Sequence, residues 1–148
     1  MAIETVDPYK TGLIKENVYE RAKRRTVKGN VVVVLDIKLD GRRLQLIPMT
    51  GRAILSGEIH ELLLTDEENA GPGAEVNSVG VVGFMEFTHG GIIAAGDKVT
   101  IGSRVIGAIA GFDETHYPNH LNIVMRTSRR MTGFDLMIEV EDPVTIFR

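Results

Sequence analysis

The second half of the chain is a series of short apolar segments separated by tight turns. From residue 79 onward five segments read VGVVGFMEF, KVTIG, RVIGAIAG, HLNIVMRT and FDLMIEV, and glycine recurs inside them. Short strands at regular spacing are typical of barrels and sandwiches, and glycines within strands permit the bulges that a closed sheet needs. The sequence therefore predicts a mainly β fold, a small β-barrel or barrel-like sandwich.

The residues before this series extend the same pattern. VVVVLDIKL and RRLQLIPM flank Asp40-Gly41, which predicts a hairpin between two strands. Residues 52–64, RAILSGEIHELLL, are ambiguous between strand and helix, and Gly57 favours a strand with a break. The acidic stretch TDEENAGPGAEVNS, about residues 65–78, is rich in Gly and Pro. A loop of that length in a small domain is either functional or mobile.

One helix is expected ahead of the strands. Apolar residues recur at helical spacing after Thr11, at Leu13, Ile14, Val18 and Ala22. This pattern predicts a helix from Thr11 to about Arg25. Its basic end either complements the helix dipole or offers a docking patch for an acidic partner or a phosphate. We expect a single domain over residues 1–148, with an N-terminal segment and helix (1–26) and a β-rich core (27–148).

Composition excludes several classes of function. The net charge of −3 over 148 residues gives no electrostatic case for nucleic acid as a partner. The absence of cysteine excludes disulfides, thiol catalysis and cysteine-based zinc sites. No apolar run approaches the roughly 18–20 residues of a membrane helix, and the N-terminus lacks the pattern of a signal peptide. We therefore expect a cytoplasmic protein with no nucleic-acid or membrane partner.

His89 lies in the stretch FTHGG, where Gly90 and Gly91 leave its imidazole uncrowded. An exposed, neutral imidazole can serve as a nucleophile, an acid/base group or a ligand, so His89 is the candidate catalytic residue. The amides of Gly90 and Gly91 can form an anion-binding nest, and Arg129-Arg130 can grip a carboxylate or phosphate. The alternative is that THGG only closes a hairpin and that both arginines are solvated.

A second candidate site is the stretch DETHYPNHLN. His116 and His120 are four residues apart, but Pro118 argues against a helix between them. In a turn the two imidazoles can converge, with Asp113 or Glu114 completing a nitrogen and oxygen site for a divalent metal. The alternative is a polar turn without a ligand, and no other cofactor is predicted. HExxH, P-loop and GxSxG motifs are all absent.

A family resemblance rests on His89-Gly90, the segment GIIAA, Gly96-Asp97, KVTIG, RVIGAIAG, DETHYPN and His120-LNIVM. This order of features, over about residues 89–127, resembles the glucitol/sorbitol-specific IIA component of the phosphotransferase system. That family is a small cytoplasmic β-barrel phosphocarrier. The resemblance implies a barrel and implies that His89 carries a phosphoryl group.

The sequence leaves three functions open. The first is a cytoplasmic β-barrel that binds a small molecule or a protein without catalysis, because no complete catalytic constellation is present. The second is a histidine phosphocarrier that uses His89, and the third is a metal-dependent enzyme or binder that uses His116 and His120. Whether the protein is an enzyme therefore stays open. The expected partners are a small anionic ligand, a protein, or a second copy of the chain, since exposed sheet edges invite pairing.

Overall fold

The structure is a computed structural model that describes Asp7 and residues 17–148. The described residues form eleven β-strands and contain no helix. The strands are β1 (Val27–Leu39), β2 (Leu44–Gln45), β3 (Gly51–Ile54), β4 (Ile59–Thr65), β5 (Glu75–Val76), β6 (Val79–His89), β7 (Gly91–Ala94), β8 (Lys98–Ile101), β9 (Arg104–Asp113), β10 (Asn122–Arg126) and β11 (Pro143–Phe147). The expected mainly β fold is confirmed.

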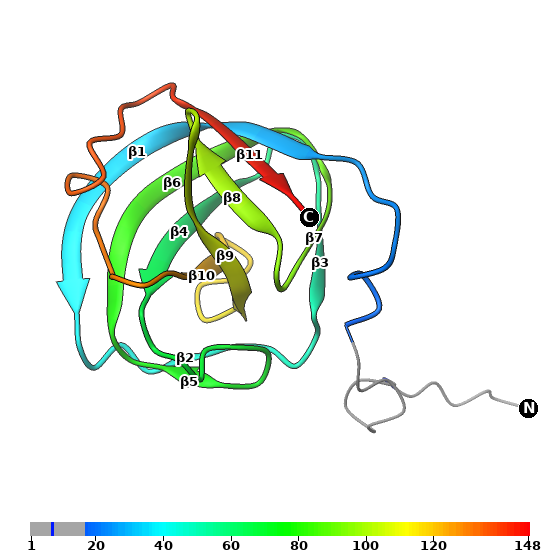
Figure 1. Ribbon diagram of the computed structural model, residues 1–148, viewed down its shortest axis with the longest axis horizontal. Coiled ribbons are helices and arrows are strands. Elements are labelled where there is room, and N and C mark those ends of the chain that lie inside the picture. Colours follow the sequence, from blue (N-terminus) through cyan, green and yellow to red (C-terminus); the bar gives the residue numbers. More distant parts are fainter. Residues whose placement is uncertain (1–6, 8–16) are drawn as a thin grey trace, which may run out of the picture.

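Seven strands follow one another in a closed ring (Figure 1). Their order is β1, β11, β8, β9, β10, β4 and β6, and β6 pairs with β1 again. Neighbouring strands are antiparallel except β10 and β4, which run parallel. Two small sheets, β2 with β5 and β3 with β7, lie outside the ring. Because every ring strand has two neighbours, the ring satisfies backbone polar groups that an open sheet leaves at its edges.

Glycine permits the close approach of β1 and β6. Gly83 has a φ of 150°, which residues with a side chain rarely adopt, and a Cβ there would collide with the carbonyl oxygen of Val33. The pairing of the two strands shifts register on either side of this contact, between Val31 and Val33 and between Val34 and Ile37. These irregularities bend the two longest strands of the ring.

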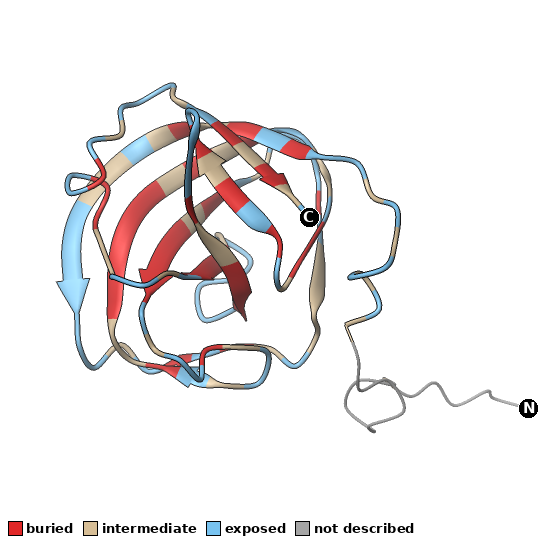
Figure 2. Cartoon of the chain, in the orientation of Figure 1, coloured by how far each residue is buried: buried red, intermediate tan, exposed pale blue. Residues whose placement is uncertain are grey.

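The apolar residues form two buried clusters. The larger fills the ring and includes Phe87, Phe112 and Met125. The smaller lies where β2 and β5 cover strands of the ring, and it includes Leu44 and Leu63. Figure 2 shows β4 and β6 largely buried, whereas the second half of β1 beside them is exposed. The alternation of the sequence predicts fourteen core residues, of which ten are buried: Leu44, Leu46, Val81, Val99, Ile101, Ile106, Ile109, Ile123, Met125 and Leu136. The other four are only half-buried: Val32, Val34, Phe84 and Ile138.

The expected N-terminal helix is not present in residues 17–25, which form a turn and bends. The beginning of that prediction, from Thr11 to residue 16, lies outside the described residues. Asn17 explains part of the difference, because its Oδ1 accepts the N–H of Tyr19 at 3.0 Å. Such a local side-chain bond offers the backbone an alternative to a helix.

The hairpin predicted at Asp40-Gly41 is wrong, since β1 pairs with β6 and β11 whereas β2 pairs with β5. The chain leaves the ring after Asp40. The N–H of Arg42 donates to the carbonyl oxygen of Asn77 at 3.1 Å, and Arg43 has a φ of 55°. These contacts carry the segment across the outside of the ring instead of back along β1.

The strand predicted at FDLMIEV is also wrong, because residues 133–137 form turns. The N–H of Thr132 donates to Oδ2 of Asp135, and the N–H of Asp135 donates to Oγ1 of Thr132, both at 3.1 Å. Met137 then has a φ of 55°, outside the strand region. The strand lies later, at β11, which begins with a proline. By contrast, Gly57 (φ 95°) does separate two strands, β3 and β4, as its position predicts.

Candidate functional site

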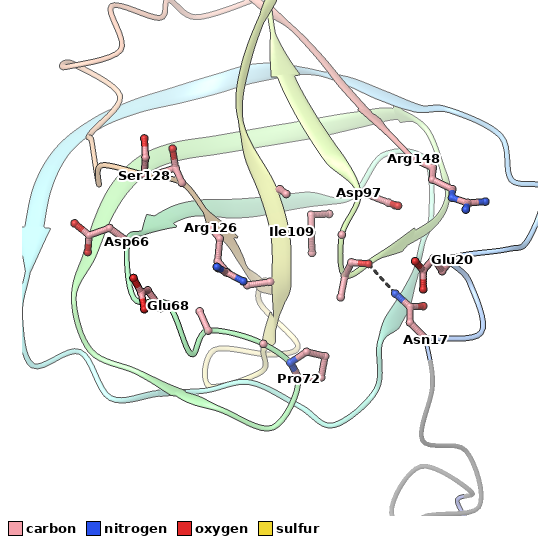
Figure 3. A pocket seen from close by; sticks show the side chains of 17 residues that line it. Asn17, Glu20, Asp66, Glu68, Pro72, Asp97, Ile109, Arg126, Ser128 and Arg148 are labelled. Carbon is pink, nitrogen blue, oxygen red and sulfur yellow. Dashed lines mark hydrogen bonds between the residues drawn. The ribbon is translucent and has the colours of Figure 1, made fainter.

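A pocket of about 970 Å³ lies between the N-terminal segment, the acidic loop and the strands β9 and β10 (Figure 3). Its described acidic residues are Glu20, Asp66, Glu68 and Asp97, and its described basic residues are Arg126 and Arg148. Its apolar lining includes Ala70, Pro72, Ala95, Ala108, Ile109 and Ala110. This volume falls within the range of natural small-molecule sites.

The acidic loop, residues 65–78, forms an ordered wall of this pocket. Glu67 holds its two ends together, because Oε2 accepts the N–H of Asn77 at 2.7 Å and the N–H of Ser78 at 2.6 Å. Oγ1 of Thr65 donates to the carbonyl oxygen of Ser78 at 2.7 Å. Glu67 therefore serves the loop itself, whereas its neighbours Asp66 and Glu68 are exposed and line the pocket.

Arg126 is the last residue of β10, and it pairs in the parallel ladder with Thr65, the residue before Asp66. Its side chain is exposed, and it makes no hydrogen bond or ion pair with any described residue. In Figure 3 the guanidinium lies between Glu68 and Ile109. Among the described residues, the Arg126 guanidinium and the carboxylates of Asp66 and Glu68 have no hydrogen-bond or ion-pair partner, and all three line the pocket. Sequence reasoning missed Arg126, although a charge that ends an apolar strand is the signal that marks it.

An ion pair fixes the opposite wall. NH1 and NH2 of Arg24 donate to the two carboxylate oxygens of Asp97, at 2.8 and 2.7 Å. Asp97, whose side chain is 3% exposed, also accepts the N–H of Ala94 at 2.9 Å. The hydrogen bond with Asp97 raises the pKa of Arg24. Nδ2 of Asn17 donates to the carbonyl oxygen of Ala95 at 2.7 Å, so three hydrogen bonds attach residues 17–24 to the β7–β8 turn.

His89 ends β6 on the surface, exposed and directly opposite Lys28 of β1. The N–H of Gly90 donates to Oγ of Ser56 at 3.0 Å, and Gly91 pairs with Ile54 in the β3–β7 ladder. Neither glycine has a positive φ; Gly90 instead sits where a Cβ would collide with the carbonyl oxygen of Ile54. The exposed imidazole of His89 thus stands opposite Lys28, and the amide of Gly90 is used in a hydrogen bond within the protein.

His116 and His120 do come together, with ring centroids 5.2 Å apart. Nε2 of His116 accepts from Arg42 at 3.2 Å, and Nδ1 of His120 accepts from Asn119 at 2.7 Å. Burial lowers the pKa of His120. Among the described residues, no group of three or more His, Asp or Glu side chains could hold a metal ion. Asp113 is engaged elsewhere, since it accepts the N–H groups of Gln45 and Thr115 and the amide of Asn122.

Glu61 of β4 interacts electrostatically with His116 and is in register with Phe84 on one side and Asn122 on the other. Burial raises the pKa of Glu61, against the attraction of Arg42 and His116. Two buried atoms of this region, Oδ1 of Asn122 and Nε2 of His120, have no hydrogen-bond partner among the described residues. Burial is therefore the main cause of the pKa shifts of both Glu61 and His120.

His60 lies on the same strand and is fully engaged. Its Nδ1 accepts the N–H of Leu121 at 2.9 Å, so Nε2 carries the proton and donates to Glu58 at 2.8 Å. Burial lowers the pKa of His60, which keeps the ring neutral. These contacts explain His60 as a structural residue that joins β4 to β10.

The two predicted anion-binding arginines have different surroundings. Arg130 donates to the carbonyl oxygen of Leu39 at 3.0 Å and pairs with Asp40 at 2.8 Å. Arg129 is exposed, and neither arginine lines the pocket. Arg130 therefore secures the segment after β10 to the end of β1.

The described residues define an all-β protein with a ligand-sized pocket of mixed charge. Residues 21–147 match a family of unknown function, DUF6917, and the chain belongs to that family. No curated protein and no solved structure matches the chain. No helix in the described residues is long and apolar enough to cross a membrane.

Proposed function

We propose that this protein is a cytoplasmic β-barrel that binds a small polar molecule in the pocket around Arg126. The observation that carries the proposal is the Arg126 guanidinium, which has no partner among the described residues and lines a pocket of about 970 Å³. An arginine in a cleft presents a rigid fork of donors that suits a carboxylate or a phosphate. The ordered wall built by Glu67 supports a pre-formed site, which lowers the entropy lost on binding.

The composition of the pocket favours binding over catalysis. Its described lining contains the hydroxyls of Thr127 and Ser128 but no histidine that could activate them. Asp97 cannot serve as a base without losing its ion pair with Arg24. The pocket residues thus supply recognition groups, whereas the perturbed histidines lie elsewhere.

A fragment screen tests this proposal. In a heteronuclear NMR screen of small charged fragments, we expect hits that move the amide signals of residues 65–72, 95–97 and 126–128. Arg126→Ala should weaken the best anionic hit at least tenfold, because a hydrogen bond to a charged group contributes about 1.5–3 kcal/mol. Arg129→Ala, a nearby exposed arginine outside the pocket, should leave its affinity unchanged. Hits that bind Arg126→Ala as well as the natural protein would refute the site.

Exposure of His89 opposite Lys28 favours a second function, that of a histidine phosphocarrier. A neighbouring ammonium stabilises a phosphoryl group on the imidazole and attracts an acidic donor. Incubation with the phosphorylated general phosphocarrier protein should then give an acid-labile label, and His89→Ala should abolish it. His116→Ala is the control and should keep the label. Unlabelled natural protein would exclude this function. Self-association stays a further prediction, testable by sedimentation.

A further inference from the structure

We propose, building on the binding function above, that the pocket selects an aliphatic zwitterion: a small flexible molecule with an anionic group and an ammonium group joined by a hydrocarbon chain. Three features of the pocket carry this assignment. They are the Arg126 guanidinium and the Asp66 and Glu68 carboxylates, which have no partner among the described residues, and an apolar lining in which no described residue is aromatic.

Arg126 is a partner for the anionic group of the ligand. Its side chain has no hydrogen bond or ion pair with any described residue, and Figure 3 places its guanidinium within the pocket, which Arg148 also lines. Ser128 and Thr127, the residues that follow it, add hydroxyl donors to the same lining. A carboxylate or phosphate can therefore accept several hydrogen bonds here.

The ammonium group would bind the acidic wall. Asp66 and Glu68 are exposed, line the pocket, and make no hydrogen bond or ion pair with any described residue. Glu67 between them is committed to the backbone of Asn77 and Ser78, which fixes the loop that presents them. The position of Arg126 opposite Thr65 brings the cation next to the start of this loop.

This arrangement disfavours ligands of a single charge. A simple anion on Arg126 would lie near two carboxylates, and a simple cation at the carboxylates would lie near a guanidinium. A molecule with both groups gains from each side and meets repulsion from neither. Recognition of paired charges therefore gives selectivity that Arg126 alone cannot supply.

The part of the ligand between its charges should be aliphatic. Ala95, Ala108, Ile109 and Ala110 line the pocket, and none of its described lining residues is aromatic. Aromatic faces are what nucleobases and sugar rings usually stack upon. A short hydrocarbon chain suits the small apolar side chains that are present.

Three probes of similar length test the assignment: 6-aminohexanoate, hexanoate and hexylamine, titrated by heteronuclear NMR. We expect 6-aminohexanoate to bind at least tenfold more tightly than either single-charge probe. Arg126→Met should weaken 6-aminohexanoate and hexanoate. The double variant Asp66→Asn, Glu68→Gln should weaken 6-aminohexanoate and hexylamine but strengthen hexanoate. Both variants should keep the natural amide spectrum away from the pocket, because the replaced side chains have no partner in the described part of the chain.

Equal or tighter binding of hexanoate, or no binding of 6-aminohexanoate, would overturn the inference. If fragments of another class still occupy the pocket in a manner that depends on Arg126, the binding function stands and only the charge assignment fails. If no fragment of any class binds there, the binding function fails as well. The two failures are therefore distinguishable.

Discussion

Replacing Arg24 with methionine should lower the free energy of unfolding by about 3 kcal/mol, the lower end of what removing one partner of a buried ion pair costs. The carboxylate of Asp97 is 3% exposed, and Arg24 supplies two of its three hydrogen bonds. Methionine keeps much of the packing but leaves that carboxylate buried without a counter-charge. The midpoint of thermal unfolding should fall by roughly 10 °C for a chain of this size.

Lys23→Met is the matched control, because it removes one positive charge from an exposed neighbour and should shift the midpoint by less than about 2 °C. Adding Asp97→Asn to Arg24→Met should restore part of the loss, since a neutral amide can still accept the N–H of Ala94. If the free-energy losses of Arg24→Met and Asp97→Asn simply added in the double variant, the two residues would not interact and the prediction would be wrong. Urea denaturation followed by circular dichroism measures all five proteins: the natural protein, Arg24→Met, Asp97→Asn, their double variant and Lys23→Met.

The fold class was readable from the sequence because it depends on local patterns. Short apolar segments bounded by glycine turns predict strands, and Gly57 and Gly96-Asp97 mark turns that the structure contains. The strand pairings were less readable, because they depend on contacts between distant residues. The Asp40-Gly41 hairpin fails since Arg42 bonds to Asn77, thirty-five positions further along the chain. β11 was missed, although its proline stands at the first residue of the strand, where proline is tolerated.

The site was readable only in part, for the same reason. The length of the acidic loop predicted a segment that is either functional or mobile, and in the structure the loop lines the pocket. Its partner Arg126 is some sixty residues away, and only the parallel pairing of β10 with β4 brings them together. The sequence left open whether His116 and His120 converge, and in the structure their ring centroids lie 5.2 Å apart. The position of Glu61 near them follows from the strand register, which no local pattern reveals.

Replacing Glu61 with glutamine should stabilise the protein above neutral pH by an amount on the order of 1 kcal/mol. Burial raises the pKa of Glu61 above the 4.5 of a free side chain, although Arg42 and His116 act in the opposite direction. The folded protein thus favours the neutral carboxyl group. Its stabilising contribution is complete below pH 4.5 and is lost as the pH rises through the raised pKa. Glutamine stays neutral throughout, so this loss should disappear in the variant.

The register of the sheet adds a second reason for the gain. Oδ1 of Asn122 is buried without a donor among the described residues, while the amide nitrogen of Asn122 is committed to Asp113 at 3.0 Å. Glu61 is the residue opposite Asn122 in the β4–β10 ladder, and a glutamine amide there can donate to Oδ1. Urea denaturation at pH 5, 6, 7 and 8 should show a flatter decline for Glu61→Gln than for the natural protein. Glu139→Gln replaces an exposed glutamate and is the control, so it should leave the decline unchanged. If Glu61→Gln were less stable than the natural protein at pH 8, attraction by Arg42 and His116 would outweigh desolvation, and the prediction would be wrong.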